Sequence, residues 1–191
     1  MNDNSSIHRF EREPAKRVFA SELREAHYHF KVGSDEKSPT FLLLPTGERC
    51  NRIFLIGTLT EKKKSEGENV FYQIRVMDPT GTFFISAGSF QPEALHQIAS
   101  IEPPSFVAII GKPGVFKAPD GRNLVSVRAE SVAAVDKEIR DCWIMDTAKL
   151  TLGRIESSID DDDHQKALEI YQKPFESWRP MVKEALSSIQ I

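Results

Sequence analysis

Aromatic and basic side chains gather on one face of the clearest strand in the sequence. Along residues 70–77 the side chains alternate as they do in a strand with one buried face. The face expected in the core carries Tyr72, Ile74 and Val76, and the opposite face carries Phe71, Gln73, Arg75 and Met77. Exposed aromatic rings can stack on nucleobases, and an arginine beside them can contact phosphate. This face therefore indicates a surface suited to a nucleic acid strand.

A β-hairpin is expected to position this face. The tetrapeptide Asp78-Pro79-Thr80-Gly81 follows it, with proline fixing φ and glycine free to take a positive φ, so residues 82–87 should return antiparallel. Upstream, residues 51–59 are β-branched and aromatic, with Gly57 near the middle. A glycine inside a strand often marks a bend or bulge where a sheet curls. The triplet Lys62-Lys63-Lys64 is expected in the loop between the two strands.

The order of the elements predicts a barrel. A helix is expected from Gln91-Pro92-Glu93, because proline and an acidic side chain both suit the first turn. Residues 105–111 and 123–135 are typical of two further strands, joined by a long loop over 112–122. Three strands, a helix and two strands form the order of the five-stranded oligonucleotide/oligosaccharide-binding (OB) barrel. The alternative is a generic all-β sandwich with an incidental helix.

We therefore expect a mainly β protein: an OB-fold barrel with a helix between strands 3 and 4, an N-terminal extension and C-terminal α-helices. The expected divisions are a partly flexible extension (1–40), the barrel (41–135), an assembly helix (136–159), and an acidic break with a helical tail (160–191). Within the extension, a short helical turn and a strand near residues 28–32 are expected. A further short strand is expected at 41–44, at the start of the barrel division.

The helix expected after the barrel has two apolar faces. One face carries Val135, Ile139, Cys142, Trp143 and Leu150, and the other carries Ile144, Met145, Ala148, Leu152, Ile155 and Ile159. A helix with two apolar faces needs two packing partners. The barrel can supply one, and either the chain's own tail or another subunit can supply the second.

OB barrels hold single strands across the face of strands two and three and between the loops joining strands one to two and four to five. The expected nucleic-acid contacts are therefore outward residues of these strands and cations or rings of these loops. The strand positions are Phe71, Gln73, Arg75, Phe84, Ser86 and Arg128, and the loop positions are Lys62, Lys63, Lys64, Phe116, Lys117 and Arg122. Burial of Phe71 and Phe84 under the N-terminal segment or the helices is the competing interpretation.

The sequence offers little for other chemistries. It contains no Walker loop, nucleophile elbow, HExxH motif or paired Cys/His spacing, so we expect no enzyme, no cofactor and no metal site. The aspartates at 160–163 are expected to form an acidic linker. A net charge of −3 argues against coating of nucleic acid by bulk charge, although a local basic groove is compatible with it. The polar N-terminus and the lack of a long apolar run predict a cytoplasmic protein without membrane contact.

Three segments carry a resemblance to a known family. They are LLPTGERCNRIFLIGTLTE, RVMDPTGTFFISAGSFQPEA and PPSFVAIIGKPGVFKAPDGRNLVSVRAESV. The chain resembles the archaeal replication protein A-associated proteins over roughly residues 17–155. The resemblance implies a role in single-stranded DNA-binding complexes of replication, repair and recombination. It also implies that the helix after the barrel bundles with a larger replication protein A subunit. We expect this contact on the second apolar face of the helix, through Ile144, Met145, Ala148, Leu152 and Ile155.

Two other functions share the same residues. One is a pure interaction subunit whose barrel face contacts protein, and the other is an RNA-binding OB module.

Overall fold

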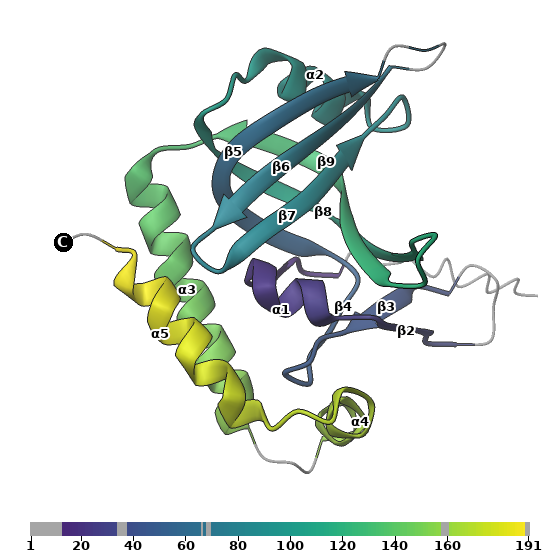
Figure 1. The fold of residues 1–191 in the computed structure, drawn as a ribbon, viewed down its shortest axis with the longest axis vertical. Coiled ribbons are helices and arrows are strands. Elements are labelled where there is room, and N and C mark those ends of the chain that lie inside the picture. The colour runs from purple at the N-terminus through teal and green to yellow at the C-terminus, as the bar shows by residue number, and fades with distance from the viewer. Residues whose placement is uncertain (1–12, 34–37, 66, 68–69, 158–160, 190–191) are drawn as a thin grey trace, which may run out of the picture.

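A computed structural model describes residues 13–33, 38–65, 67, 70–157 and 161–189. Its centre is a closed sheet of five strands (Figure 1): β5 (Ile53–Ser65), β6 (Phe71–Asp78), β7 (Gly81–Ala87), β8 (Ser105–Lys117) and β9 (Asn123–Ala134). The strands follow the order β5-β6-β7-β9-β8, and β8 pairs again with β5. Helix α2 (Pro92–Ser100) lies between β7 and β8. This connectivity is that of an OB-fold, so the predicted fold class is confirmed and the sandwich alternative is excluded.

Strand β5 closes the barrel because it changes partner along its length. Its residues 53–59 pair with β8, and its residues from 58 to 65 pair with β6, with a register shift between Leu59 and Glu61. A Cβ at Gly57 would lie 2.4 Å from the backbone oxygen of Met77. Only glycine permits this approach of the two strands, which confirms the bend predicted at this position.

Two predicted loops are wrong. The lysine triplet lies in β5, where Lys62, Lys63 and Lys64 pair with Ile74, Gln73 and Tyr72 of β6. The predicted loop at 112–122 is shortened to 118–122, because β8 and β9 stay paired out to Lys117 and Asn123. The two strands thus continue past the barrel as a hairpin, which we call the arm (residues 112–128).

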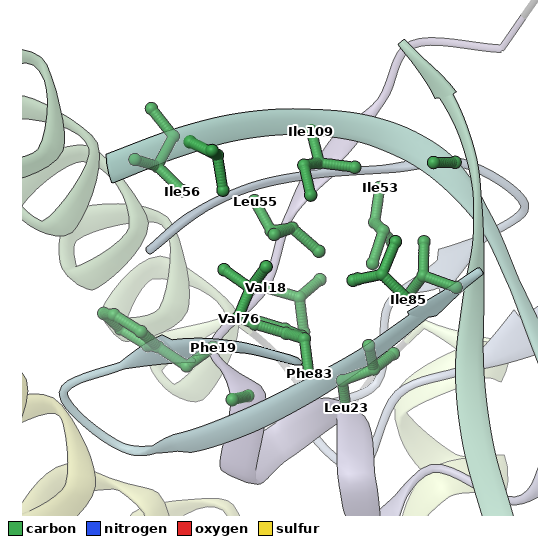
Figure 2. Close-up of a cluster of buried hydrophobic side chains, with 14 of the residues drawn as sticks. Val18, Phe19, Leu23, Ile53, Leu55, Ile56, Val76, Phe83, Ile85 and Ile109 are labelled. Carbon is green, nitrogen blue, oxygen red and sulfur yellow. The ribbon is translucent and has the colours of Figure 1, made fainter. Parts of the chain in front are cut away.

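The N-terminal segment completes the core. Strand β1 (Lys16–Arg17) pairs in parallel with β5, and helix α1 (Ala20–Glu25) follows it. Val18, Phe19 and Leu23 are buried among side chains of the barrel strands (Figure 2). A separate sheet is formed by β2 (Tyr28–Lys31), β3 (Thr40–Leu43) and β4 (Arg49–Cys50). The strands predicted near residues 28 and 41 are therefore present, but they belong to this second sheet and not to the barrel.

The turn between β6 and β7 holds α1 in place through Asp78. The Ala20 amide donates to Asp78 Oδ2 at 2.7 Å, and the amides of Thr80 and Gly81 donate to Oδ1 at 2.7 and 2.9 Å. Burial raises the pKa of this carboxyl to about 6, although these hydrogen bonds act in the opposite direction. A single carboxyl thus joins the hairpin to the start of the helix.

This pKa predicts a pH dependence of stability. Between about pH 4 and pH 6 the folded state holds a proton on Asp78 that the unfolded chain has released, so the contribution of Asp78 to stability falls as pH rises through this window. Asp78→Asn removes the titration. Urea unfolding at several pH values should show the wild type losing on the order of 2–3 kcal/mol relative to the variant across the window. A difference that is flat, or that grows in favour of the wild type, would contradict the assignment.

The long helix α3 (Lys137–Glu156) begins at Asp136, whose side chain accepts a hydrogen bond from the Ile139 amide at 2.8 Å. Its buried residues form one stripe and not two faces. They are Trp143, Ile144, Thr147, Ala148, Thr151, Arg154 and Ile155. Of the first predicted face only Trp143 is buried, and Ile139 and Leu150 are exposed, so that face is wrong. The two expected packing partners are present, because Trp143 meets the barrel and α5 packs beside Ile144 and Ala148.

The tail packs back onto the chain. It forms α4 (Asp162–Tyr171), the 3₁₀ turn η1 (Phe175–Trp178) and α5 (Arg179–Ser187), and α5 lies alongside α3 (Figure 1). Val182 and Ala185 of α5 join Ile144 and Ala148 in the main core cluster. The chain's own tail thus covers this side of α3, which is one of the two alternatives that the sequence left open.

This packing corrects the predicted partner interface. Ile144, Ala148 and Ile155 are 0%, 2% and 6% exposed, and Leu152 is half-buried. Of these five residues only Met145 is exposed, at 50%. The predicted position Ile159 lies outside the described residues. Among the residues that the structure describes, no helix is long and apolar enough to cross a membrane.

Candidate nucleic-acid interface

A groove of about 360 Å³ lies on the outer face of β6 and β7, between the end of β5 and the arm. Strand alternation explains its lining, since Tyr72, Ile74 and Val76 point into the core and their neighbours point outward. The outward residues that line it are Phe71, Gln73 and Arg75 from β6, Phe84 and Ser86 from β7, Glu61 and Lys63 from β5, Phe116 from β8, and Leu124 and Ser126 from β9.

Cross-strand pairing sets the centre of the groove. Arg75 lies opposite Phe84, and Gln73 lies opposite Ser86. The guanidinium carbon of Arg75 is 5.7 Å from the centroid of the Phe84 ring, within cation–π range. Phe84 is 45% exposed, and Phe116 is 50% exposed. Aromatic rings and a cation are therefore accessible side by side on an outer sheet face. The competing interpretation, in which other elements bury these rings, is wrong for Phe84, whereas Phe71 is half-buried.

Glu61 moderates the charge of the groove. Its carboxylate accepts from Lys63 Nζ at 2.7 Å and lies 3.0 Å from Arg75 Nε. The hydrogen bond from Lys63, with the nearby Arg75, holds the pKa of Glu61 below its usual range. An incoming phosphate must therefore compete with Glu61 for both cations. Glu61 thus neutralises part of the positive charge that Lys63 and Arg75 bring to the groove.

Most of the predicted contact residues meet here. The groove brings together Lys63, Phe71, Gln73, Arg75, Phe84, Ser86 and Phe116. It does not include Lys62, Lys64, Lys117, Arg122 or Arg128. Lys117 and Arg122 lie at the end of the arm, where Arg122 forms an ion pair with Asp120 at 2.7 Å, and Arg128 faces a separate cleft.

Lys62 has a structural role. Its side chain is only 13% exposed, and its ammonium donates to the carbonyl oxygens of Ala99 and Ile101 at 3.2 and 2.9 Å and to the Glu102 carboxylate at 2.7 Å. These carbonyls end helix α2, where a cation is favoured. Lys62 therefore fastens α2 to β5 and is not part of the groove.

Sequence reasoning missed Glu61, Leu124 and Ser126. The alternation of Val125 and Val127 toward the core carried the signal for Leu124 and Ser126, because residues on either side of an inward position point outward. The sequence carries no comparable signal for Glu61, because an acidic side chain is not a typical contact for phosphate, although it sits one residue before the lysine triplet.

Comparison with family models and with curated proteins found no match. Among solved structures, the chain is similar to the second single-stranded DNA-binding protein of Mycobacterium smegmatis, at 16% identity and a TM-score of 0.39, over 45% of this chain and 87% of that chain. It is similar to a mitochondrial single-stranded DNA-binding protein of S. cerevisiae, at 16% identity and a TM-score of 0.35, over 45% of this chain and 94% of that chain. It is also similar to the yeast Stn1 and Ten1 structure, at 11% identity and a TM-score of 0.44, over 65% of this chain and 64% of that chain. The fold assignment rests on the strand connectivity and not on these likenesses.

Proposed function

We propose that this chain binds single-stranded DNA through the groove on β6 and β7. The observation that carries the proposal is the convergence of Phe71, Phe84 and Phe116 with Arg75 and Lys63 on one accessible face. Such a face is the usual binding surface of an OB barrel. The protein acts without catalysis, as a subunit or accessory factor of a replication protein A-type complex in DNA replication, repair and recombination. The resemblance to archaeal replication protein A-associated proteins supports this setting.

Each part of the groove has a role in this proposal. The three phenylalanine rings stack on bases, which contributes about 1–3 kcal/mol per base. Arg75 and Lys63 exchange part of their contact with Glu61 for backbone phosphates, which makes binding salt-dependent. Gln73 and Ser86 offer hydrogen bonds to base edges. Because the groove is short and the chain carries a net charge of −3, binding by the isolated chain is weak, and assembly with a larger subunit supplies the remaining affinity.

Helix α3 remains the proposed assembly element, with a revised surface. Ile139 and Leu150 are each 47% exposed and lie about three turns apart on the same side of the helix, whereas the exposed Met145 lies on a different side. Apolar side chains at helical spacing on one side of a helix are suited to packing against a partner helix. The partner contact is therefore proposed on this side, and not on the side that α5 covers.

Replacing Phe84 or Phe71 by alanine tests the groove. Fluorescence anisotropy with a labelled 20-nucleotide thymidine oligomer should show each variant binding about 5- to 150-fold more weakly, because each loses one stacking platform. Phe90→Ala is the matched control, since Phe90 is 92% exposed but does not line the groove. Equal losses for Phe84→Ala and Phe90→Ala would contradict the proposal.

Two further outcomes separate the alternatives. Absence of binding to any oligomer, by the chain alone and by its complex, would favour a pure interaction subunit. Tighter binding of a uridine RNA oligomer than of the thymidine DNA oligomer would favour an RNA-binding module, because both use the same rings.

A further inference from the structure

A second cleft, of about 550 Å³, opens between the arm and the small sheet of β2, β3 and β4. One wall carries Lys112 and Arg128 from the arm, and the opposite wall carries His29 and Thr40 from β2 and β3. Figure 1 shows the end of the β8–β9 hairpin beside this sheet. All four of these side chains are exposed.

The arm connects this cleft to the groove along a single face. Three successive cross-strand pairs follow one another at every second residue: Phe116 with Leu124, Gly114 with Ser126, and Lys112 with Arg128. Residues at this spacing point to the same side of a strand pair. Phe116 and Leu124 line the groove, Ser126 lines both hollows, and Lys112 and Arg128 line the cleft. A Cβ at Gly114 would meet nothing within 4 Å, so the middle of this face is open.

The pair of cations at the end of this face is unusual. Lys112 and Arg128 lie directly opposite each other, and like charges in that position destabilise a sheet. Among the described residues neither forms an ion pair, whereas Lys63, Arg75 and Arg122 each have a carboxylate partner. An anion bound between the two would relieve their repulsion.

We propose that the cleft binds backbone phosphates of the same DNA strand whose bases stack in the groove. The DNA strand follows the open face of the arm from the pair Phe116 and Leu124 to the pair Lys112 and Arg128. It passes the pair Gly114 and Ser126 and covers about 13 Å, which is four residues along β8. His29 and Thr40 can donate hydrogen bonds to phosphate oxygens from the other wall. The small N-terminal sheet, which lies outside the barrel, thereby becomes part of the DNA site. This inference rests on the proposed function and extends it.

A charge reversal at Lys112 tests the inference with two opposite readouts. Lys112→Glu places a carboxylate across from Arg128, so the melting temperature should rise while binding of the 20-nucleotide thymidine oligomer weakens several-fold. Lys149→Glu is the matched control, since Lys149 is exposed on α3 and the variant changes the net charge equally. The control should leave the affinity nearly unchanged.

The salt dependence gives an independent measure. Lys112→Gln should reduce the slope of log affinity against log salt by about 0.7, the loss of one phosphate contact on a single strand. A three-nucleotide thymidine oligomer spans about 10 Å at ~3.4 Å per stacked nucleotide, which is shorter than the distance from Phe116 to Lys112. Its binding should be much less affected by either Lys112 variant.

The outcomes distinguish this inference from the proposed function. If Phe84→Ala weakens binding but Lys112→Glu behaves like Lys149→Glu, the cleft is not a phosphate site and the groove proposal stands. Equal losses of affinity for the short and the long oligomer would also overturn the inference. Lys112 would then act only through the overall electrostatic potential of the protein. A wild-type chain that binds neither oligomer overturns both.

Discussion

Replacing Arg154 by alanine is expected to cost about 3–5 kcal/mol of unfolding free energy, because it breaks a buried ion pair and leaves a charge without a partner. Arg154 is 7% exposed and Glu22 is 0% exposed. The guanidinium donates to Glu22 Oε2 at 2.9 Å, to Thr46 Oγ1 at 2.8 Å and to Thr151 Oγ1 at 3.0 Å. It therefore joins α1, the turn after β3 and helix α3.

The variant leaves the Glu22 carboxylate buried without the cation that neutralises it. Chemical denaturation should report the loss directly, and the melting temperature should fall by roughly 6–20 °C for a chain of this length. Lys149→Ala on the same helix is the surface control and should change stability by less than about 0.5 kcal/mol. The double variant Glu22→Leu with Arg154→Leu should recover part of the loss, because no unpaired charge remains. A loss below about 1 kcal/mol for Arg154→Ala would contradict this account of the network.

Replacing Trp143 by alanine is expected to be similarly costly, at about 3–5 kcal/mol. Trp143 is 2% exposed, its ring meets Phe19 edge to face at 5.7 Å, and its indole N–H donates to the Phe54 carbonyl at 3.1 Å. The side chain thus attaches α3 both to the N-terminal segment and to barrel strand β5. Its removal leaves a large cavity at the junction.

Trp143→Phe is the graded control. It keeps most of the ring volume but loses the hydrogen bond, so it should cost less than the alanine variant and more than a surface change. Urea unfolding of both variants measures which of them loses more unfolding free energy. Equal losses for phenylalanine and alanine would show that the hydrogen bond, and not the packing, holds the helix against the barrel.

The faces of the barrel strands could be predicted from the sequence because strand periodicity is local. The alternation of Tyr72, Ile74 and Val76 with Phe71, Gln73 and Arg75 needs no knowledge of the partner strand, and it places the outward residues correctly. Gly57 could be predicted as a bend for a similar reason, since a glycine inside a β-branched run implies close backbone approach.

The features that could not be predicted depend on distant contacts. Pro113 and Gly114 are typical loop residues, yet β8 continues through them because β9 pairs with it beyond the barrel. The sequence does not distinguish Lys62 from Lys63 and Lys64, because its contact with the end of α2 forms only in the folded chain. The tail buries one side of α3 that a partner subunit was expected to cover, and the pattern along α3 alone does not show which of the two covers it. In each case tertiary packing overrides the local signal.

A nuclear magnetic resonance titration of the ¹⁵N-labelled chain with the 20-nucleotide thymidine oligomer tests the central claim most directly. The account predicts saturable shifts of the backbone amides of Gln73, Arg75, Phe84 and Ser86, continuing along the arm toward Lys112. Addition of salt should reverse these shifts, because phosphate contacts contribute to binding. Shifts confined to α3 and α5, or no shifts at saturating oligomer, would contradict the assignment of the groove as a single-stranded DNA site.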